Sequence, residues 1–182
     1  MRKLNLFSAL IFSLFCFSAS AQEFKPGFYG VAAGGNSTIK YSTLTIKGNA
    51  YQIGAGYDFN KNVSTEFTFG SISNFGLSNG STTLNYDVTT TTIAGIFKVP
   101  LGGSLIPYGY LGRATGSESV SASSSSYSSS AASSGSRTIY GAGLEIPLEE
   151  RSSIRIQYIK SSNSATTSAQ VSMLTAGFVL RF

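Results

Sequence analysis

The 182-residue sequence has no histidine, and only 12% of its residues are charged. Without histidine there is no Ser-His or Asp-His catalytic pair and no His-ligated metal site. Ordinary soluble domains are about a quarter charged, so this surface is not kept in water by charge in the usual way. No stretch reaches the roughly 18 apolar residues of a membrane-spanning helix with suitable flanks. The common histidine-based catalytic sites and a helical membrane anchor are therefore disfavoured from the start.

Cysteine is nearly absent as well, because Cys16 is the only one. It lies in residues 1–21, which have a basic start, a short apolar run and the small-residue ending Ala19-Ser20-Ala21. This pattern predicts a secretory signal peptide that is cleaved before Gln22, rather than a buried or membrane helix. The mature domain, residues 22–182, then has no cysteine and must be stable in an oxidising compartment without a disulfide.

The positive net charge of the chain belongs partly to this leader. Removal of Arg2 and Lys3 lowers the net charge from +5 to +3. The high isoelectric point therefore does not indicate a nucleic-acid partner.

The rest of the sequence alternates between apolar and small or polar residues with a period of two, and no helical stripe of useful length interrupts it. In one segment Tyr51 and Ile53 would share one face, while Gln52 and Gly54 would share the other. A soluble sandwich also shows such alternation, but a polar face this rich in glycine better fits an inside-out barrel with a narrow interior. We expect eight strands, at residues 27–36, 50–59, 63–73, 86–99, 106–116, 137–148, 153–162 and 170–182.

The connections between these segments alternate in length. The second, fourth and sixth are short turns, whereas the others are longer stretches rich in Ser, Thr, Asn and Gly. Alternation of this kind places all the tight turns at one end of an up-and-down meander. The predicted fold is therefore an all-β, eight-stranded antiparallel transmembrane barrel with a filled interior.

Several charged residues are expected to face that interior. On the assigned faces these are Glu66, Arg113, Glu145 and Arg155, with Asp58, Gln52 and Gln157 as further polar members. Pairing the strands on either side of a turn near Glu150 places Glu145 opposite Arg155. Lone charges in so narrow a space would be costly, so we interpret the cluster as a charge-paired structural plug rather than a catalytic or gating site. We expect glycines at positions 54, 56, 109, 141 and 143 to leave room for these side chains.

Tyr and Phe are expected to form the aromatic belts of the two membrane interfaces, because the chain has no Trp. The belt near the tight turns would contain Tyr57, Phe59, Phe97, Tyr108 and Phe182, and the other would contain Tyr51, Tyr86, Tyr140 and Tyr158.

The C-terminal strand carries a recognisable pattern. It has a terminal aromatic, Phe182, apolar residues Phe178 and Leu180 at alternate positions before it, and Gly177 five residues upstream. This resembles the signal that the barrel-assembly machinery recognises on bacterial outer-membrane barrels. Three further stretches, 26–35, 106–112 and 141–145, resemble strands of the small OmpA-like and OmpX-like barrels. The resemblance implies an outer-membrane barrel of a Gram-negative bacterium that depends on periplasmic chaperones and contacts outer-membrane lipids and lipopolysaccharide.

Residues 117–136 contain thirteen serines, and we expect them to form a mobile extracellular loop. The function that fits best is a non-enzymatic envelope protein with a structural or surface-interaction role, which binds a host or surface ligand through its loops. A small-solute pore and a lipid-modifying outer-membrane enzyme are the alternatives, and the enzymes of that kind known to us use a histidine. We expect no cofactor and no metal.

Overall fold

The computed structural model describes residues 25–41, 44–73, 77–79, 82–101, 105–124, 127–162 and 170–182. The predicted signal peptide lies outside these residues. In the described part of the chain, no helix is long and apolar enough to cross a membrane.

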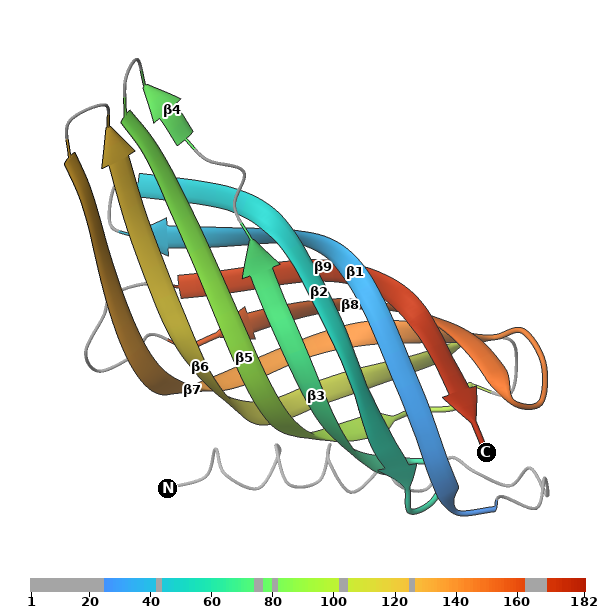
Figure 1. Ribbon diagram of the computed structural model, residues 1–182. Helices are drawn as coiled ribbons and strands as arrows, with labels where there is room; N and C mark the ends of the chain where they lie inside the picture. The colour runs from blue at the N-terminus through green and yellow to red at the C-terminus, as the bar shows by residue number, and fades with distance from the viewer. Residues whose placement is uncertain are drawn as a thin grey trace, which may run out of the picture.

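Within these residues, every regular element is a β-strand that pairs antiparallel with its neighbours. The sheet order is β3-β2-β1-β9-β8-β7-β6-β5-β4, and an additional pairing of β3 with β5 closes the sheet into a barrel of eight strands (Figure 1). Short β4 pairs only with β5, outside the ring. The strands are β1 (Gly27–Tyr41), β2 (Leu44–Asp58), β3 (Val63–Ser73), β4 (Leu77–Asn79), β5 (Thr82–Lys98), β6 (Ile106–Ser124), β7 (Tyr127–Pro147), β8 (Ser152–Ser161) and β9 (Gln170–Arg181).

The strands are staggered as closure of a barrel requires. A row of paired residues that starts at Ser152 on β8 runs through Leu180 on β9 and around the ring to Thr138 on β7. The carbonyl oxygen of Thr138 accepts a hydrogen bond from the backbone N–H of Ser162. The row therefore returns to β8 ten residues beyond its start, and an eight-stranded barrel of this kind has an interior just wide enough for side chains.

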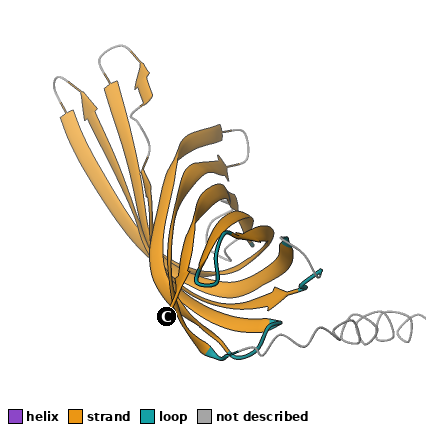
Figure 2. Cartoon of the chain, turned by 90° about the vertical axis from the view of Figure 1, so that its right-hand side faces the viewer, coloured by secondary structure: helices purple, strands orange, loops and turns teal. Residues whose placement is uncertain are grey.

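All eight predicted strands are confirmed, and the tight turns lie together at one end of the barrel. The three short turns join β2 to β3, β5 to β6 and β7 to β8. At the opposite end several strands run further than expected. β5, β6 and β7 rise beyond the other strands, together with β4, as the upper left of Figure 1 and the side view of Figure 2 show. At the end opposite the tight turns, paired strands therefore occupy positions where the sequence predicted loops.

The prediction of a mobile loop at residues 117–136 is corrected. Residues 117–124 continue β6 and residues 127–136 belong to β7, and the two strands pair from Ile106↔Glu145 to Ser124↔Tyr127. A hairpin that is already anchored in the barrel gains two backbone hydrogen bonds with every second residue pair that is added. Serine needs no apolar burial to extend such a ladder, because the main chain supplies the pairing. We call the part of the sheet formed by β4 and by residues 82–87, 117–124 and 127–138 the external ribbon.

The two faces of the wall differ as the alternation predicts. Phe28, Ile53 and Phe178 each expose about two thirds of their surface on the outer face. The alternate residues Glu66, Arg155 and Thr175 are buried inside, and other strands behave in the same way. An exposed apolar surface this extensive is the reverse of a soluble domain and suits contact with hydrocarbon.

Aromatic side chains gather on the outer face near the tight turns. Phe28, Tyr57 and Phe59 make edge-to-face contacts, with centroid distances of 4.9 and 5.1 Å. Tyr108 does not belong to this belt, because it is 4% exposed and lies inside the barrel. The Tyr86 side chain lies outside the described part of the structure.

Two glycines next to large lumen side chains show why small residues are needed in the wall. A Cβ on Gly56 would overlap the ring of Tyr29, and one on Gly143 would overlap the ring of Tyr108. The expectation for Gly109 is corrected, since a Cβ there would meet nothing within 4 Å. Gly109 shares the outward face of β6 with Leu111, so it makes no room in the lumen.

Replacing Gly177 on β9 tests this close packing. A Cβ at Gly177 would overlap the backbone oxygen of Ala32 and the Ala33 side chain, so Gly177→Val should destabilise the barrel by about 1–3 kcal/mol. The matched control is Ala176→Val, whose side chain faces outward. The measurement is the temperature at which the fast-migrating, unboiled form disappears on a gel. Equal temperatures for the two variants would show that β9 does not approach β1 this closely.

Candidate functional site in the barrel lumen

The polar centre of the molecule lies inside the barrel, in the half nearest the tight turns. It is assembled from one side chain of each of the eight barrel strands, because each strand turns alternate residues inward. In strand order from β1 to β9 without β4, these residues are Tyr29, Asp58, Glu66, Lys98, Tyr108, Glu145, Arg155 and Arg181. We call this set the lumen network.

Arg155 is at the centre of the lumen network and is 1% exposed. One guanidinium nitrogen is in contact with Glu66, and the other lies 3.3 Å from Glu145. The hydroxyl of Tyr29 donates a hydrogen bond of 3.1 Å to Glu66. The two buried carboxylates thus share one cation, which offsets much of the cost of removing all three groups from water.

Asp58 and Arg181 extend the network toward the tight turns. Asp58 lies 2.6 Å from the Lys98 ammonium and 3.1 Å from Arg181. Arg181 also contacts Glu145, so it connects the Asp58 pair to the Arg155 group. Three carboxylates are therefore balanced by three cations.

Aromatic rings complete the surroundings of the buried cations. The Arg155 guanidinium carbon lies 5.6 Å from the ring centre of Tyr29 and 5.3 Å from that of Tyr108. Lys98 lies 5.4 Å from the Tyr29 ring centre. At these distances the ring faces attract a cation, and a desolvated pair gains more than an exposed one. Tyr108 also donates a 3.1 Å hydrogen bond to Gln157.

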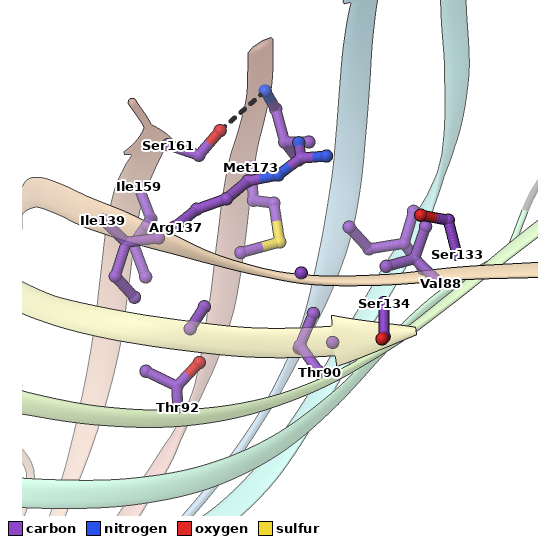
Figure 3. Close-up of a pocket in the computed structure, with 15 residues that line it drawn as sticks. Val88, Thr90, Thr92, Ser133, Ser134, Arg137, Ile139, Ile159, Ser161 and Met173 are labelled. Atoms are coloured by element: carbon purple, nitrogen blue, oxygen red, sulfur yellow. Dashed lines mark hydrogen bonds between the residues drawn. The ribbon is translucent and has the colours of Figure 1, made fainter. Parts of the chain in front are cut away.

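The other half of the lumen is mainly apolar, although Thr90, Thr92 and Arg137 also line it. Ile39, Ile72 and Val88 form one buried cluster, Ile139 and Ile159 belong to a second, and Met173 packs against both. A cavity of about 90 Å³ remains between them. In Figure 3, Ile139, Ile159 and Met173 gather on one side of this cavity, with Val88 and Ser133 on the other. A solute that entered the lumen from the end opposite the tight turns would therefore meet this mainly apolar chamber first and the lumen network next.

The sequence matches the family described as the outer membrane protein beta-barrel domain over residues 7–182. The chain belongs to this family. It is a protein of the bacterial outer membrane, and its apolar outer face lies against lipid.

Solved structures share the fold of this outer-membrane barrel at low sequence identity. Neisserial surface protein A is 18% identical, with a TM-score of 0.68, and the match covers 87% of this chain and all of that one. Ail, the attachment invasion locus protein of Yersinia pestis, is 21% identical, with a TM-score of 0.64 and coverage of 86% and 99%. Ail has also been solved in complex with the heparin analogue sucrose octasulfate, and that structure is 20% identical at a TM-score of 0.64, with the same coverage. No curated protein matches the chain.

Of the charged residues assigned to the lumen from the sequence, the structure brings Glu66, Glu145 and Arg155 together. Asp58 and Gln157 join them, whereas Gln52 lines a small void further along the barrel. The placement of Arg113 is corrected. It is exposed on the outward face of β6, and its Nε donates a hydrogen bond to Ser136. The buried neighbours Tyr108 and Tyr110 occupy the inward face, so position 113 must point outward.

Lys98, Arg181, Tyr29 and Tyr108 are members of the network that the sequence reasoning left out. Arg181 has the same strand parity as Gly177 and Thr175, which marks the inward face of β9. Lys98 has the same strand parity as the buried Ile96, and that parity was the available signal. It was weak, because Phe97 and Ile93 make the opposite face of β5 equally apolar in the sequence.

The predicted assembly signal occupies the end of β9. Phe178 and Leu180 are exposed on the lipid-facing side, and Phe182 exposes 78% of its surface. Gly177 lies on the opposite face, against Ala33. The recognition of this strand by the assembly machinery stays a prediction.

Substitution of Glu145 tests the network. Glu145→Ala leaves Arg155 with one carboxylate and Arg181 with one, and loss of a buried charged partner typically costs about 3–5 kcal/mol. We expect this variant to unfold at a lower urea concentration than the wild type. Its fast-migrating, unboiled form should also disappear from the gel at a lower temperature. Glu149→Ala in the exposed turn should change stability by no more than about 0.5 kcal/mol. Equal unfolding curves for the two variants would count against the pairing.

Proposed function

We propose that this protein is a non-enzymatic surface-interaction protein of the outer membrane, with the external ribbon as its binding element. The single observation that carries the proposal is the extension of β5, β6 and β7 beyond the ring of strands. β7 pairs with β8 only between Ile139↔Ser161 and Pro147↔Ser153, yet with β6 it pairs as far as Ser124↔Tyr127. A membrane anchor alone does not need strands of this length.

The geometry of β7 gives the ribbon a defined way to bind. The Thr138 carbonyl is directed at β8, and residues two apart in a strand direct their backbone groups to the same side. Ser136, Ser134, Ala132, Ser130 and Ser128 therefore direct N–H and C=O away from β6. Within the described residues, no strand pairs with β7 beyond Ile139 on that side. Such an edge recognises an extended polypeptide by strand addition.

A role in attachment is also consistent with the relatives that share the fold. Ail is named for attachment and invasion, and its complex with a heparin analogue is an example of a small outer-membrane barrel with a ligand. We carry over to this chain only the general idea of a surface ligand.

The lumen network supports a closed barrel rather than the alternative of a pore. Three cations and three carboxylates cross-link six of the eight barrel strands, and the central group, Arg155, is almost fully buried. Catalysis is disfavoured by the same arrangement, since each lumen carboxylate is held by at least one cation and the chain has no histidine to act as a base.

Planar-bilayer recordings test the closed lumen. The purified, refolded protein should show no conductance of porin magnitude at neutral pH. The double variant Glu66→Ala/Arg155→Ala, which removes the central side chains, should conduct more than the wild type if it still shows a heat shift. Porin-sized conductance of the wild type would overturn the closed-barrel proposal.

Strand addition is tested with paired proline variants of the ribbon. Proline is tolerated where the lost N–H points to solvent, so Ser130→Pro/Ser134→Pro should keep the β6–β7 ladder and lose only the outward edge. The probe is an immobilised Thr-Val-repeat dodecapeptide, with an N-methylated twin that cannot donate from one edge. We expect wild-type cells to bind the plain peptide, with at least tenfold less binding by the proline variant or to the N-methylated twin.

The control deletes residues 117–136 and joins the strands with a tight turn, which should abolish binding while the heat-shifted band remains. Equal binding by wild type, proline variant and deletion variant would rule out the ribbon edge. A basement-membrane extract in place of the peptide then reports whether host matrix contains such a ligand.

A further inference from the structure

The free edge of β7 in the external ribbon has none of the features that usually keep sheet edges apart. Between Ser119 and Ser136 the sequence has no charged residue and no proline. Natural edge strands are commonly protected by lysine, by proline or by a bulge that twists the edge away. From Tyr127 to Thr138, all of which are described, β7 pairs with β6 in an unbroken register, so no bulge interrupts this edge. An edge left open in this way is a template for another strand.

The charges at the outer end of the barrel lie away from this edge. Beyond the lumen network the strands carry five basic and two acidic residues, which are Lys40, Lys47, Arg113, Arg137 and Lys160, with Asp87 and Glu118. The three lysines belong to β1, β2 and β8, outside the external ribbon. The excess of positive charge opposes the approach of a second copy of the protein, whereas the β7 edge carries no charge that would do so.

The backbone groups of the edge match those of a second copy. They belong to residues of the same parity as Thr138, whose carbonyl is bonded to β8, and these are Ser128, Ser130, Ala132, Ser134 and Ser136. In an antiparallel pair of two such strands, centred on Ala132, Ser128 lies opposite Ser136 of the second copy and Ser130 opposite its Ser134. A two-fold axis relates the two strands. All five positions then fall in hydrogen-bonded pairs of two bonds each, about ten bonds in total.

The same register keeps like charges apart. Arg137 is the first charged residue of β7 beyond the edge, and it falls opposite Tyr127 of the second copy. The two arginines are therefore ten residues apart along the pair, which is about 34 Å at about 3.4 Å per residue. Like charges directly opposite each other would be destabilising, and this pairing places none there.

The direction of β7 places the second copy in a facing membrane. β7 runs from the outer tip at Tyr127 to the tight-turn end at Pro147. Two copies in one membrane present this edge in the same direction and would have to pair as parallel strands, which are slightly less stable per residue. Copies in facing membranes run in opposite directions, as antiparallel pairing requires. Residues 127–138 span about 40 Å at about 3.4 Å each, so this pairing acts between membranes in close contact.

We propose that the β7 edge of the external ribbon binds a second copy of this chain on a facing membrane, by antiparallel pairing about a two-fold axis at Ala132. The paired ribbons form one continuous sheet through β5, β6 and β7 of both copies. This inference rests on the proposed function, because it names the extended polypeptide that the edge accepts.

Cysteine cross-linking tests the two-fold register. Cys16 is the only cysteine of the sequence, so in a Cys16→Ser background an introduced cysteine is the only one. Ala132→Cys places the two cysteines of a pair directly opposite each other, with Cα atoms about 5.5 Å apart. The matched control, Ser128→Cys, places them eight residues apart, or about 27 Å. With a short bismaleimide we expect at least tenfold more cross-linked dimer from the refolded Ala132→Cys protein in neutral detergent micelles than from Ser128→Cys.

Vesicle aggregation tests the facing arrangement. Phosphatidylcholine vesicles that contain the wild type should aggregate, as followed by turbidity, whereas vesicles that contain Ser130→Pro/Ser134→Pro should remain as dispersed as empty ones. Because the pairing uses backbone groups and no charges, aggregation should persist at high salt, which screens exposed charges. The heat-shifted band of each variant confirms that the barrel is folded before aggregation is measured.

Failure of the self-pairing and failure of the proposed function give different results. If wild-type cells bind the dodecapeptide while the wild-type vesicles stay dispersed and the two cysteine variants cross-link equally, self-pairing is wrong and the edge remains a strand acceptor. If the wild type neither binds the peptide nor aggregates vesicles, both proposals are wrong. Equal aggregation by the wild type and the proline variant would also overturn the self-pairing, because it would show that another surface holds the vesicles together.

Discussion

The pairing of three buried carboxylates with three cations is the interaction on which the rest of the barrel depends. A buried charge without a partner costs several kcal/mol, so each of these side chains must find its partner for the fold to be stable. Because the partners come from strands far apart in the sequence, such as Glu66 on β3 and Arg155 on β8, pairing them constrains the register of the whole ring. A slip of one residue on any of these strands would turn its charged side chain toward lipid.

Alternation along the sequence was sufficient to predict the strands, their faces and one contact in the lumen. The Glu145↔Arg155 register follows from a short turn between two strands whose faces are unmistakable. Prediction failed where both faces of a strand are apolar. In β6, tyrosines at 108 and 110 could equally have faced lipid, and only the filled interior shows that they point inward and Arg113 outward. The external ribbon was missed for another reason, because it forms by main-chain pairing and has few apolar residues to signal a strand.

The molecule divides its surface by the medium that each part meets. Aromatic and aliphatic side chains cover the wall, the interior balances its own charges, and the outer end retains the excess of positive charge. The apolar chamber around Met173 lies between the closed lumen network and the exterior. The wall, the interior and the outer end therefore have different physical roles, although the same strands form all three.

The external ribbon is held by backbone pairing, and this has an evolutionary consequence. Side chains on a ribbon that contributes no core are free to change as long as they tolerate an extended backbone and closely spaced neighbours. The most accessible part of the molecule is thus also the part in which substitutions disturb the barrel least. In the proposed orientation, residues 117–124 and 127–136 form a surface whose antigenic identity is able to drift while the shape of its backbone, and any ligand that binds that backbone, is retained.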